Sequence, residues 1–264
     1  MQANRVNING VSVHYHVVGH GPDVMFLHGW SSSQKMWDAV SSALAVTHRC
    51  WTLDWPGFGH SEKPGDFWYS IPNFTETLYH FAESMGLRQL DVVGHSMGGL
   101  IALDFAATHP ERVRRLVAIN PVVSGRVALG PLTGWRRHGV VLGRLHQLSR
   151  EWLMPVLHNP FIASLPRSVQ HVRRKHLEFN QATPQSLLGS GRAILDYDVR
   201  PKLKHITAKT AIILSTIDVS VPSSEGHFAA VEIPNARLYV LPATHTLTDD
   251  RPAESLKLLR QILA

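Results

Sequence analysis

Cysteine is almost absent from this sequence, since Cys50 is the only one among 264 residues. A single thiol excludes an internal disulfide framework and any metal site built from several cysteines. The apolar neighbours of Cys50 predict a buried core thiol without a reactive role.

Long hydrophobic runs are also missing. No uninterrupted apolar stretch approaches the ~20 residues that a helix needs to span a bilayer. The N-terminal residues follow a strand-like pattern and lack the charged start and apolar run of a signal peptide. We therefore expect a cytoplasmic protein without a membrane span.

The overall composition is ordinary for a globular protein. Hydrophobic residues make up 44% of the chain and charged residues 17%, both close to the average of folded domains. A chain of 264 residues can bury a large core as one unit. Neither an internal repeat nor a low-complexity tract is present, so we expect a single enzyme-sized unit.

Strand-like and helix-like segments alternate along most of the chain. Strands are expected at residues 11–17, 23–27, 49–53, 90–93, 113–119, 209–215 and 237–241, and helices at 35–42, 74–85, 97–108, 224–231 and 252–263. This alternation predicts an α/β fold with a mostly parallel sheet. In the first strand, His14 and His16 alternate with apolar residues, which predicts that both lie on its wetter face.

The alternation stops after residue 121. Between residues 122 and 205 there is no convincing strand, and proline, tryptophan, arginine and histidine accumulate. This stretch has 13 Lys/Arg against 4 Asp/Glu, a net charge of +9, whereas the remainder has 13 basic and 16 acidic residues, a net of −3. We predict a helical cap at residues 122–205, inserted into a core formed by residues 1–121 and 206–264.

The most informative segment is Gly-His-Ser-Met-Gly at residues 94–98, which lies between an apolar strand and an apolar helix. This is the context of a nucleophile elbow, where a serine occupies the tip of a strained turn. The turn is tolerable only without bulky side chains two residues away, and Gly94 and Gly98 meet that condition. Gly99 lets the helix pack closely on the sheet. Ser96 is therefore the predicted nucleophile; the alternative is a tight turn with an idle serine.

A nucleophilic serine needs a base, and the base needs a group that orients it. Asp218 and His245 each lie in a loop directly after an expected strand. The chain order Ser96, Asp218, His245 is the order found in folds with a nucleophile elbow. Because loops after parallel strands emerge at one edge of the sheet, we predict that the three side chains converge there as a catalytic triad.

Other residues compete for these roles. Asp249 and Asp250 follow the histidine too closely in the chain to replace Asp218, and we expect them to cap the next helix. The end of the strand at 113–119 is another place for the acid, but the residue there is Asn120. The sequence contains 17 histidines, so the catalytic one is distinguished by its position and not by its type.

An ester intermediate carries an oxyanion, and its stabilisation needs two convergent amides. Residues 26–30, Phe-Leu-His-Gly-Trp, end an early strand, and Gly29 lets the backbone approach closely. The amides of Trp30 and Met97 are therefore the predicted oxyanion hole. His28 is expected to anchor the loop by hydrogen bonds, and the Trp30 side chain either lines the acyl pocket or packs beneath it.

Together these motifs resemble the α/β-hydrolase fold superfamily, in its cap-bearing, serine-nucleophile branch. The resemblance covers most of the chain apart from the insertion. It rests on His-Gly-Trp at 28–30, Asp-Trp-Pro-Gly-Phe-Gly-His-Ser at 54–61, Gly-His-Ser-Met-Gly-Gly at 94–99, Asp-Val-Ser-Val-Pro at 218–222, and His245 followed by Arg251-Pro252. It implies that residues 54–61 form a structural loop beside the active site and that the cap follows the sixth strand. One departure is Thr244, where glycine commonly precedes the histidine.

The resemblance also narrows the reaction. Haloalkane dehalogenases and epoxide hydrolases of this superfamily use aspartate where this chain has Ser96. Carbon–carbon bond hydrolases typically carry a longer glycine-rich oxyanion segment, and proline iminopeptidases usually have tryptophan in place of Met97. A carboxylic ester hydrolase with a serine acyl-enzyme mechanism remains, and it requires no metal and no organic cofactor.

The predicted cap combines apolar and basic side chains. The apolar candidates for an acyl-chain wall are Trp135, Trp152, Met154, Leu157 and Phe161, and the basic residues include Arg136, Arg137, Arg173, Arg174 and Lys175. The charge is either a solvated surface or a means of attracting an acidic substrate or partner. Esterases that cleave methyl esters of acyl groups on acyl carrier protein look similar in the His-Gly-Trp motif and the basic cap. A small-molecule ester is thus the expected substrate, and an acidic carrier protein is a hypothetical partner.

Two other classes of function stay open. Some proteins that resemble this family keep an intact triad but serve as small-molecule receptors with slow turnover. Nucleic-acid binding is suggested only by a pI of about 9.7. No recognition motif accompanies the charge, so we expect no nucleic-acid partner.

Overall fold

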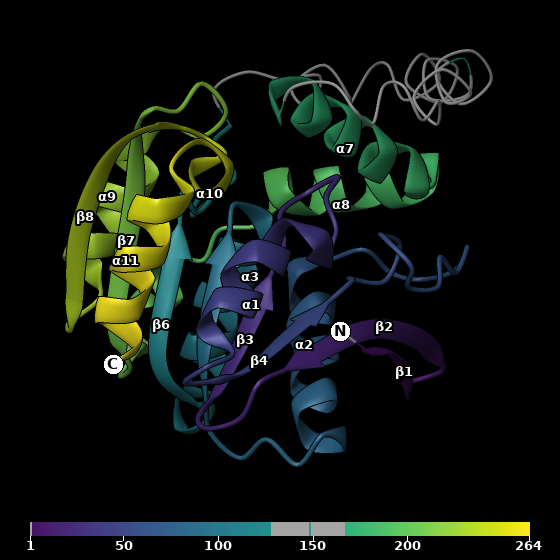
Figure 1. The fold of residues 1–264 in the computed structure, drawn as a ribbon, viewed down its shortest axis with the longest axis horizontal. Coiled ribbons are helices and arrows are strands. Elements are labelled where there is room, and N and C mark those ends of the chain that lie inside the picture. The colour runs from purple at the N-terminus through teal and green to yellow at the C-terminus, as the bar shows by residue number, and fades with distance from the viewer. Residues whose placement is uncertain (1, 128–147, 149–166) are drawn as a thin grey trace.

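The computed structural model describes residues 2–127, 148 and 167–264. Its strands are β1 (Gln2–Ile8), β2 (Val11–Val18), β3 (Asp23–Leu27), β4 (Arg49–Leu53), β5 (Leu90–His95), β6 (Val113–Ile119), β7 (Lys209–Ile217) and β8 (Ala236–Thr244). They form one eight-stranded sheet in the order β1-β2-β4-β3-β5-β6-β7-β8 (Figure 1). All neighbouring strands from β4 to β8 in this order are parallel. Strand β2 is antiparallel to both of its neighbours, β1 and β4. The predicted α/β fold is confirmed.

Helices cover both faces of this sheet. The α-helices are α1 (Asp38–Leu44), α2 (Ile71–Ser84), α3 (Met97–Thr108), α7 (Arg167–Gln181), α8 (Pro184–Asp196), α9 (Ser223–Glu232), α10 (Leu247–Asp250) and α11 (Pro252–Leu263). Short 3-10 turns occur at η1 (Gln34–Trp37), η2 (Pro110–Arg112) and η4 (Arg200–His205). One face is covered by α1 and α11, and the other by α2, α3 and α9 (Figure 1). The helices predicted from the sequence all occur, with ends shifted by a few residues.

Side-chain alternation along β3 supplies both halves of the core. Val24 and Phe26 pack under α1 and α11, whereas Met25 and Leu27 face α2 and α3. All four are fully buried, and each such side chain contributes about 1.5–3 kcal/mol through the hydrophobic effect. Cys50 is buried in the first of these clusters, and burial raises the pKa of its thiol to about 12. The prediction of an unreactive core thiol agrees with this environment.

A hairpin at the edge of the sheet was not predicted. Its turn is Asn9-Gly10, with φ angles of 51° and 88°, and Ile8 pairs with Val11 across it. Two consecutive left-handed residues produce the tight turn whose twist matches that of the flanking strands, and Asn-Gly is the favoured pair for it. The hairpin adds β1 to the sheet beyond β2.

The expectation that His14 lies on a wetter face is wrong. His14 is 6% exposed, and its Nδ1 lies 2.9 Å from Asp54 Oδ2. The fully buried Asp54 carboxylate also accepts the amides of Gln34 at 2.7 Å and His60 at 2.8 Å. Burial alone would raise the pKa of Asp54, but the hydrogen bonds from His14, Gln34 and His60 lower it. The residues from 54 to 61 are thus organised around one buried anion, in agreement with the structural role implied by the resemblance.

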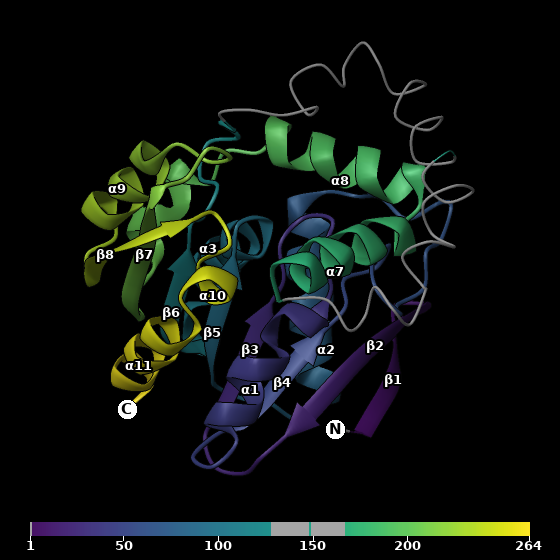
Figure 2. The ribbon, with the colours of Figure 1, turned by 45° about the horizontal axis from the view of Figure 1, so that its top comes forward.

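Two helices of the insertion lie beyond the carboxyl ends of the parallel strands. Figures 1 and 2 show α7 and α8 across this end of the sheet, next to α1 and α3. The insertion follows β6, as predicted. Its two described ends meet, because the Val199 amide donates to the Val123 carbonyl at 2.9 Å. The predicted limits of the cap, residues 122 and 205, stay a prediction. Nowhere in the described ranges is a helix both long and apolar enough to cross a bilayer.

His28 anchors the loop after β3, as expected. Its Nε2 accepts the Trp55 amide at 3.0 Å, so its Nδ1 must carry the proton that is donated to the Gly29 carbonyl at 2.8 Å. The ring is completely buried, and burial lowers its pKa to about 4. The folded protein therefore holds His28 in its neutral form.

A buried neutral histidine makes stability depend on pH. Above pH 6.5 the His28 ring is neutral in both folded and unfolded chains, whereas between pH 6.5 and about 4 only the unfolded chain takes up the proton. The free energy of unfolding should therefore fall as the solution is acidified, by about 2 kcal/mol at pH 5 from this residue alone. Urea unfolding at pH 7 and pH 5 measures the change. An unchanged free energy would contradict the prediction, and a His28→Asn variant should lose less than the wild type over this interval.

Candidate active site

Ser96 lies in the sharp turn between β5 and α3. Its backbone is in the left-handed region, with φ 56° and ψ −115°, a conformation that costs a non-glycine residue about 1–3 kcal/mol. A Cβ atom on Gly94 would lie 2.2 Å from the carbonyl oxygen of Gly98. The turn therefore needs glycine at position 94, for the steric reason inferred from the sequence.

The second glycine of the motif makes room for another chain segment. A Cβ on Gly98 would lie 2.3 Å from the Leu27 carbonyl oxygen, so the first turn of α3 packs on the backbone at the end of β3. This contact brings the loop that contains Trp30 against the helix end that begins with Met97. The first amides of a helix have no partner within it, and they can therefore bind an anion. The two amides predicted to form the oxyanion hole thus belong to adjoining segments.

His245 and Asp218 meet across the ends of β7 and β8. His245 Nδ1 lies 2.6 Å from Asp218 Oδ2, and the other carboxylate oxygen accepts the amides of Ser220 at 2.8 Å and Val221 at 2.9 Å. The Asp218 side chain is 4% exposed and that of His245 is 18% exposed. The acid is thus fixed and enclosed, while the imidazole keeps access to solvent.

The protonation of this pair follows from its contacts. Burial alone would raise the pKa of Asp218, but the hydrogen bond and charge of His245 and the two amides lower it. An ionised carboxylate only accepts hydrogen bonds, so the proton lies on Nδ1 of His245. In the neutral ring Nε2 is then unprotonated and can act as a base.

His95 and Asn120 hold the backbone of His245. His95 Nε2 lies 2.8 Å from the His245 carbonyl oxygen, and Asn120 Nδ2 lies 3.0 Å from the same atom. Asn120 also binds Ser215 through both ends of its amide, at 2.9 Å and 2.8 Å. The ends of β5, β6 and β7 are thereby tied to one carbonyl.

The sequence did not predict this clamp. Asn120 was considered only as a place where an acid is absent, and His95 only as part of the serine motif. Their proximity could be inferred from parallel pairing, because His95 and Ile119 are register partners on β5 and β6. The His95 ring is buried, and burial holds its pKa well below 6.5. It is therefore neutral and donates from Nε2.

The predicted capping role of Asp249 and Asp250 is wrong. The first turn of α11 has no side-chain cap. Asp250 instead accepts the Thr244 amide at 2.8 Å and the Thr244 hydroxyl at 2.5 Å, and Asp249 binds Arg174 of α7 at 2.6 Å. These bonds hold the loop that carries the histidine. Thr244, which stands where glycine is usual, therefore contributes a hydroxyl that donates to Asp250.

One face of α7 contacts the loop after β3. The buried Glu178 carboxylate accepts the hydroxyls of Ser32 and Ser33, each at 3.0 Å. Phe179 packs edge-on against Trp30 with ring centroids 6.4 Å apart, and the indole N–H of Trp30 donates to Leu187 of α8 at 3.2 Å. The Trp30 indole thus contacts both α7 and α8; whether it lines the acyl pocket or packs beneath it stays a prediction.

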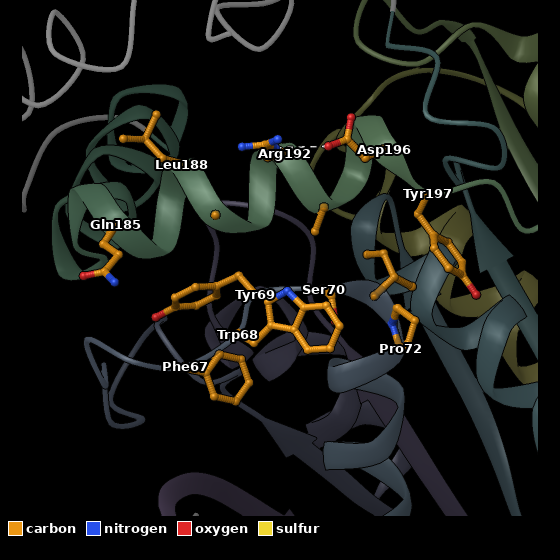
Figure 3. Close-up of a pocket in the computed structure, with 13 residues that line it drawn as sticks. Phe67, Trp68, Tyr69, Ser70, Pro72, Gln185, Leu188, Arg192, Asp196 and Tyr197 are labelled. Carbon is orange, nitrogen blue, oxygen red and sulfur yellow. Dashed lines mark hydrogen bonds and ion pairs between the residues drawn. The ribbon is translucent and has the colours of Figure 1, made fainter.

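A separate groove of about 980 Å³ lies between α8 and residues 67–72 (Figure 3). Phe67, Trp68 and Tyr69 form its floor, and Trp68 is 76% exposed. None of Ser96, Asp218 and His245 belongs to its lining residues. Several predicted cap residues lie outside the described part of the chain: Trp135, Arg136, Arg137, Trp152, Met154, Leu157 and Phe161. Within the described ranges no three His, Cys, Asp or Glu side chains are placed to hold a metal ion.

Comparison with known proteins identifies the family to which this fold belongs. The α/β hydrolase fold family matches residues 22–243. The chain is 26% identical over 268 residues to pimeloyl-[acyl-carrier protein] methyl ester esterase of Aeromonas hydrophila, covering 96% of this chain and 100% of that protein. It is 37% identical over 129 residues to 2-hydroxymuconate semialdehyde hydrolase of Pseudomonas putida, covering 48% of this chain and 46% of that enzyme.

A solved structure supports the same fold. A hydrolase from Pseudomonas aeruginosa PA01 superposes with a TM-score of 0.83 at 24% identity, over 99% of this chain and 98% of that one. The match to the family extends from before β3 into β8 and so includes Ser96 and Asp218. The chain therefore belongs to the α/β hydrolase fold family.

Proposed function

We propose that this protein is a serine esterase that cleaves carboxylic esters through an acyl-enzyme, with Ser96, His245 and Asp218 as its catalytic triad. The observation that carries the proposal is the 2.6 Å hydrogen bond between His245 and the enclosed Asp218. The backbone of His245 is in turn tied to His95, the residue directly before the strained Ser96. The distant likeness to an esterase over the whole chain supports the same reaction class.

In the first half of the reaction, His245 Nε2 takes the proton of Ser96 while the serine oxygen attacks the ester carbonyl. The amides of Trp30 and Met97 stabilise the oxyanion, and each such donor contributes about 10²–10³ in turnover. The protonated histidine then gives its proton to the departing alcohol. An ester between the acyl group and Ser96 is left.

In the second half, His245 activates a water molecule that attacks the acyl-enzyme. The same oxyanion forms and collapses, which releases the carboxylic acid and returns the proton to Ser96. Asp218 keeps the proton of the neutral ring on Nδ1 and stabilises the imidazolium, an effect that is worth about 10⁴ in a related triad. The chain's own side chains and amides supply every step.

A carrier-bound ester is a second candidate for the substrate. The likeness to pimeloyl-[acyl-carrier protein] methyl ester esterases favours it, as does the net charge of +9 on residues 122–205. The basic residues Arg173, Arg174 and Lys175 do not act as one free patch, however. Arg174 is paired with Asp249, and Lys175 is partly buried. Attraction of a carrier protein would therefore depend on the remaining basic residues of the cap.

The nucleophile can be tested with p-nitrophenyl esters from acetate to laurate. We expect turnover to peak at one chain length and to fall by on the order of 10⁶-fold in Ser96→Ala, because the attacking oxygen is lost. Circular dichroism of the variant checks that it folds. Equal turnover in the variant would exclude Ser96. A folded wild type that cleaves no ester would favour the receptor interpretation.

The clamp on His245 predicts a loss of rate without a loss of affinity. Asn120→Ala removes one of the two donors to the His245 carbonyl, and a small displacement of a catalytic group can cost about 10²-fold. We expect kcat to fall roughly 10-fold to 100-fold with KM nearly unchanged. Ser215→Ala is the matched control, since it removes another Asn120 contact and leaves the one to His245. A kcat equal to that of the control would contradict the role.

If a carrier protein is recognised, the enzyme should prefer the carrier-bound ester to the free ester, and salt should abolish this preference. A methyl ester of an acyl group on acyl carrier protein should be hydrolysed with a kcat/KM at least about 10-fold above that of the same ester free in solution, because opposite charges steer association. The advantage should disappear between roughly 0.05 M and 0.5 M salt, as screening shortens the reach of the charges. Equal values for both esters at low salt would exclude the carrier as a recognised partner.

A further inference from the structure

The inner face of α7 is defined by its contacts. Arg174 binds Asp249 next to the loop of the catalytic histidine, at 2.6 Å. One turn later, Glu178 binds the serines after the oxyanion loop and Phe179 contacts Trp30. This face of α7 therefore lies between the loop after β3 and α10, the short helix that follows His245.

Lys175 occupies the same face. It precedes Glu178 by three residues and Phe179 by four, and residues at these spacings lie above one another on a helix. Its side chain is partly buried. Burial is the main cause of the low pKa of His28 and of His95, and the positive charge of Lys175 lowers each pKa further. These two residues lie at the base of the predicted oxyanion loop and directly before Ser96. The amine is thus directed toward the proposed site and away from the outer surface of the cap.

The Lys175 amine makes no hydrogen bond and no ion pair in the part of the chain that the structure describes. The acids closest to it are engaged elsewhere. Both oxygens of Glu178 accept serine hydroxyls, and Asp249 accepts the guanidinium of Arg174. Burial lowers the pKa of Lys175, which is the effect of withdrawing an ammonium group from water without giving it a close partner. A ligand with a negative charge would supply that partner.

We propose that Lys175 is a specificity-determining residue that binds a carboxylate on the substrate, held close to the ester carbonyl that Ser96 attacks. The inference rests on the proposed esterase function and names its substrate class: short esters that carry a free carboxylate, such as half-esters of dicarboxylic acids. A charge-assisted hydrogen bond to the ammonium would orient the acyl chain. This bond would fix the orientation of the ester carbonyl relative to Ser96.

The charges around Lys175 favour a single negative charge on the ligand. Lys175 and Arg174 are balanced by Glu178 and Asp249, so the group is neutral overall before a ligand enters. A carboxylate brings one unit of negative charge and pairs with the free amine. A phosphate dianion would bring two units beside two acidic side chains, and like charges at close range repel. Carboxylate is therefore the favoured ligand.

The test compares matched esters on matched variants. The pair is the mono-p-nitrophenyl ester of glutaric acid and p-nitrophenyl pentanoate, which have similar length and differ in the terminal carboxylate. The readout is the ratio of their kcat/KM values. Lys175→Met should lower the ratio roughly 10-fold to 100-fold, the range expected for loss of a charged hydrogen bond, and Lys175→Arg should retain part of the preference. Lys35→Met removes an equal charge from an exposed position of η1 and should leave the ratio unchanged.

A binding measurement separates this inference from the proposed function. Calorimetric titration of Ser96→Ala with monomethyl glutarate should show binding that is lost in the double variant Ser96→Ala/Lys175→Met. Equal binding by the two variants, or a ratio unchanged by Lys175→Met, would overturn the role of Lys175. Absence of hydrolysis of every ester by a folded wild type would instead overturn the esterase function, and the titration would still decide whether Lys175 binds the carboxylate.

Discussion

The backbone carbonyl of His245 is the point on which the geometry of the site depends. Two side chains from the ends of adjacent central strands, His95 and Asn120, donate to it, so the loop of the base is fixed to the strand that leads into Ser96. The proposed triad therefore does not rely on the hydrogen bond to Asp218 alone. Asp218 holds the side chain of His245, and His95 and Asn120 hold its main chain. Parallel strands make this arrangement available, because their carboxyl ends lie at one edge.

The cap is attached to the core by charged groups as well as by apolar contacts. Arg174 and Glu178, one turn apart on α7, reach α10 and the loop after β3 respectively. Breaking such a pair leaves an uncompensated charge in a poorly hydrated place, which is strongly destabilising. The contacts thus set the position of α7 against the loop after β3 and against α10. Lys175 lies between them on the same helix, so its amine is positioned by two anchored neighbours.

Much of the fold and the site could be predicted because local chemistry dictates them. Position 94 must be glycine where a strand turns so tightly into a helix, and the order of the motifs along the chain predicted the contact between Asp218 and His245. Contacts between distant residues could not be predicted in this way. Asp249 was assigned a local capping role, whereas it binds Arg174, which lies 75 residues away. Lys175 was grouped with a basic surface, since a count of charges does not say which face of a helix carries them.

The site also concentrates conformational cost. Among the described residues, the non-glycine positions with positive φ are Asn9, Ser31, Ser96 and Asn120, and all except Asn9 adjoin the proposed reaction centre. Ser31 and Ser96 each cost about 1–3 kcal/mol, and the neutral buried rings of His28 and His95 add a cost that grows on acidification. Burial of the two hydrophobic clusters, one on each side of the sheet, offsets this free-energy cost. A strained turn supported by a rigid sheet keeps Ser96 in place, which an unstrained and mobile loop would not do.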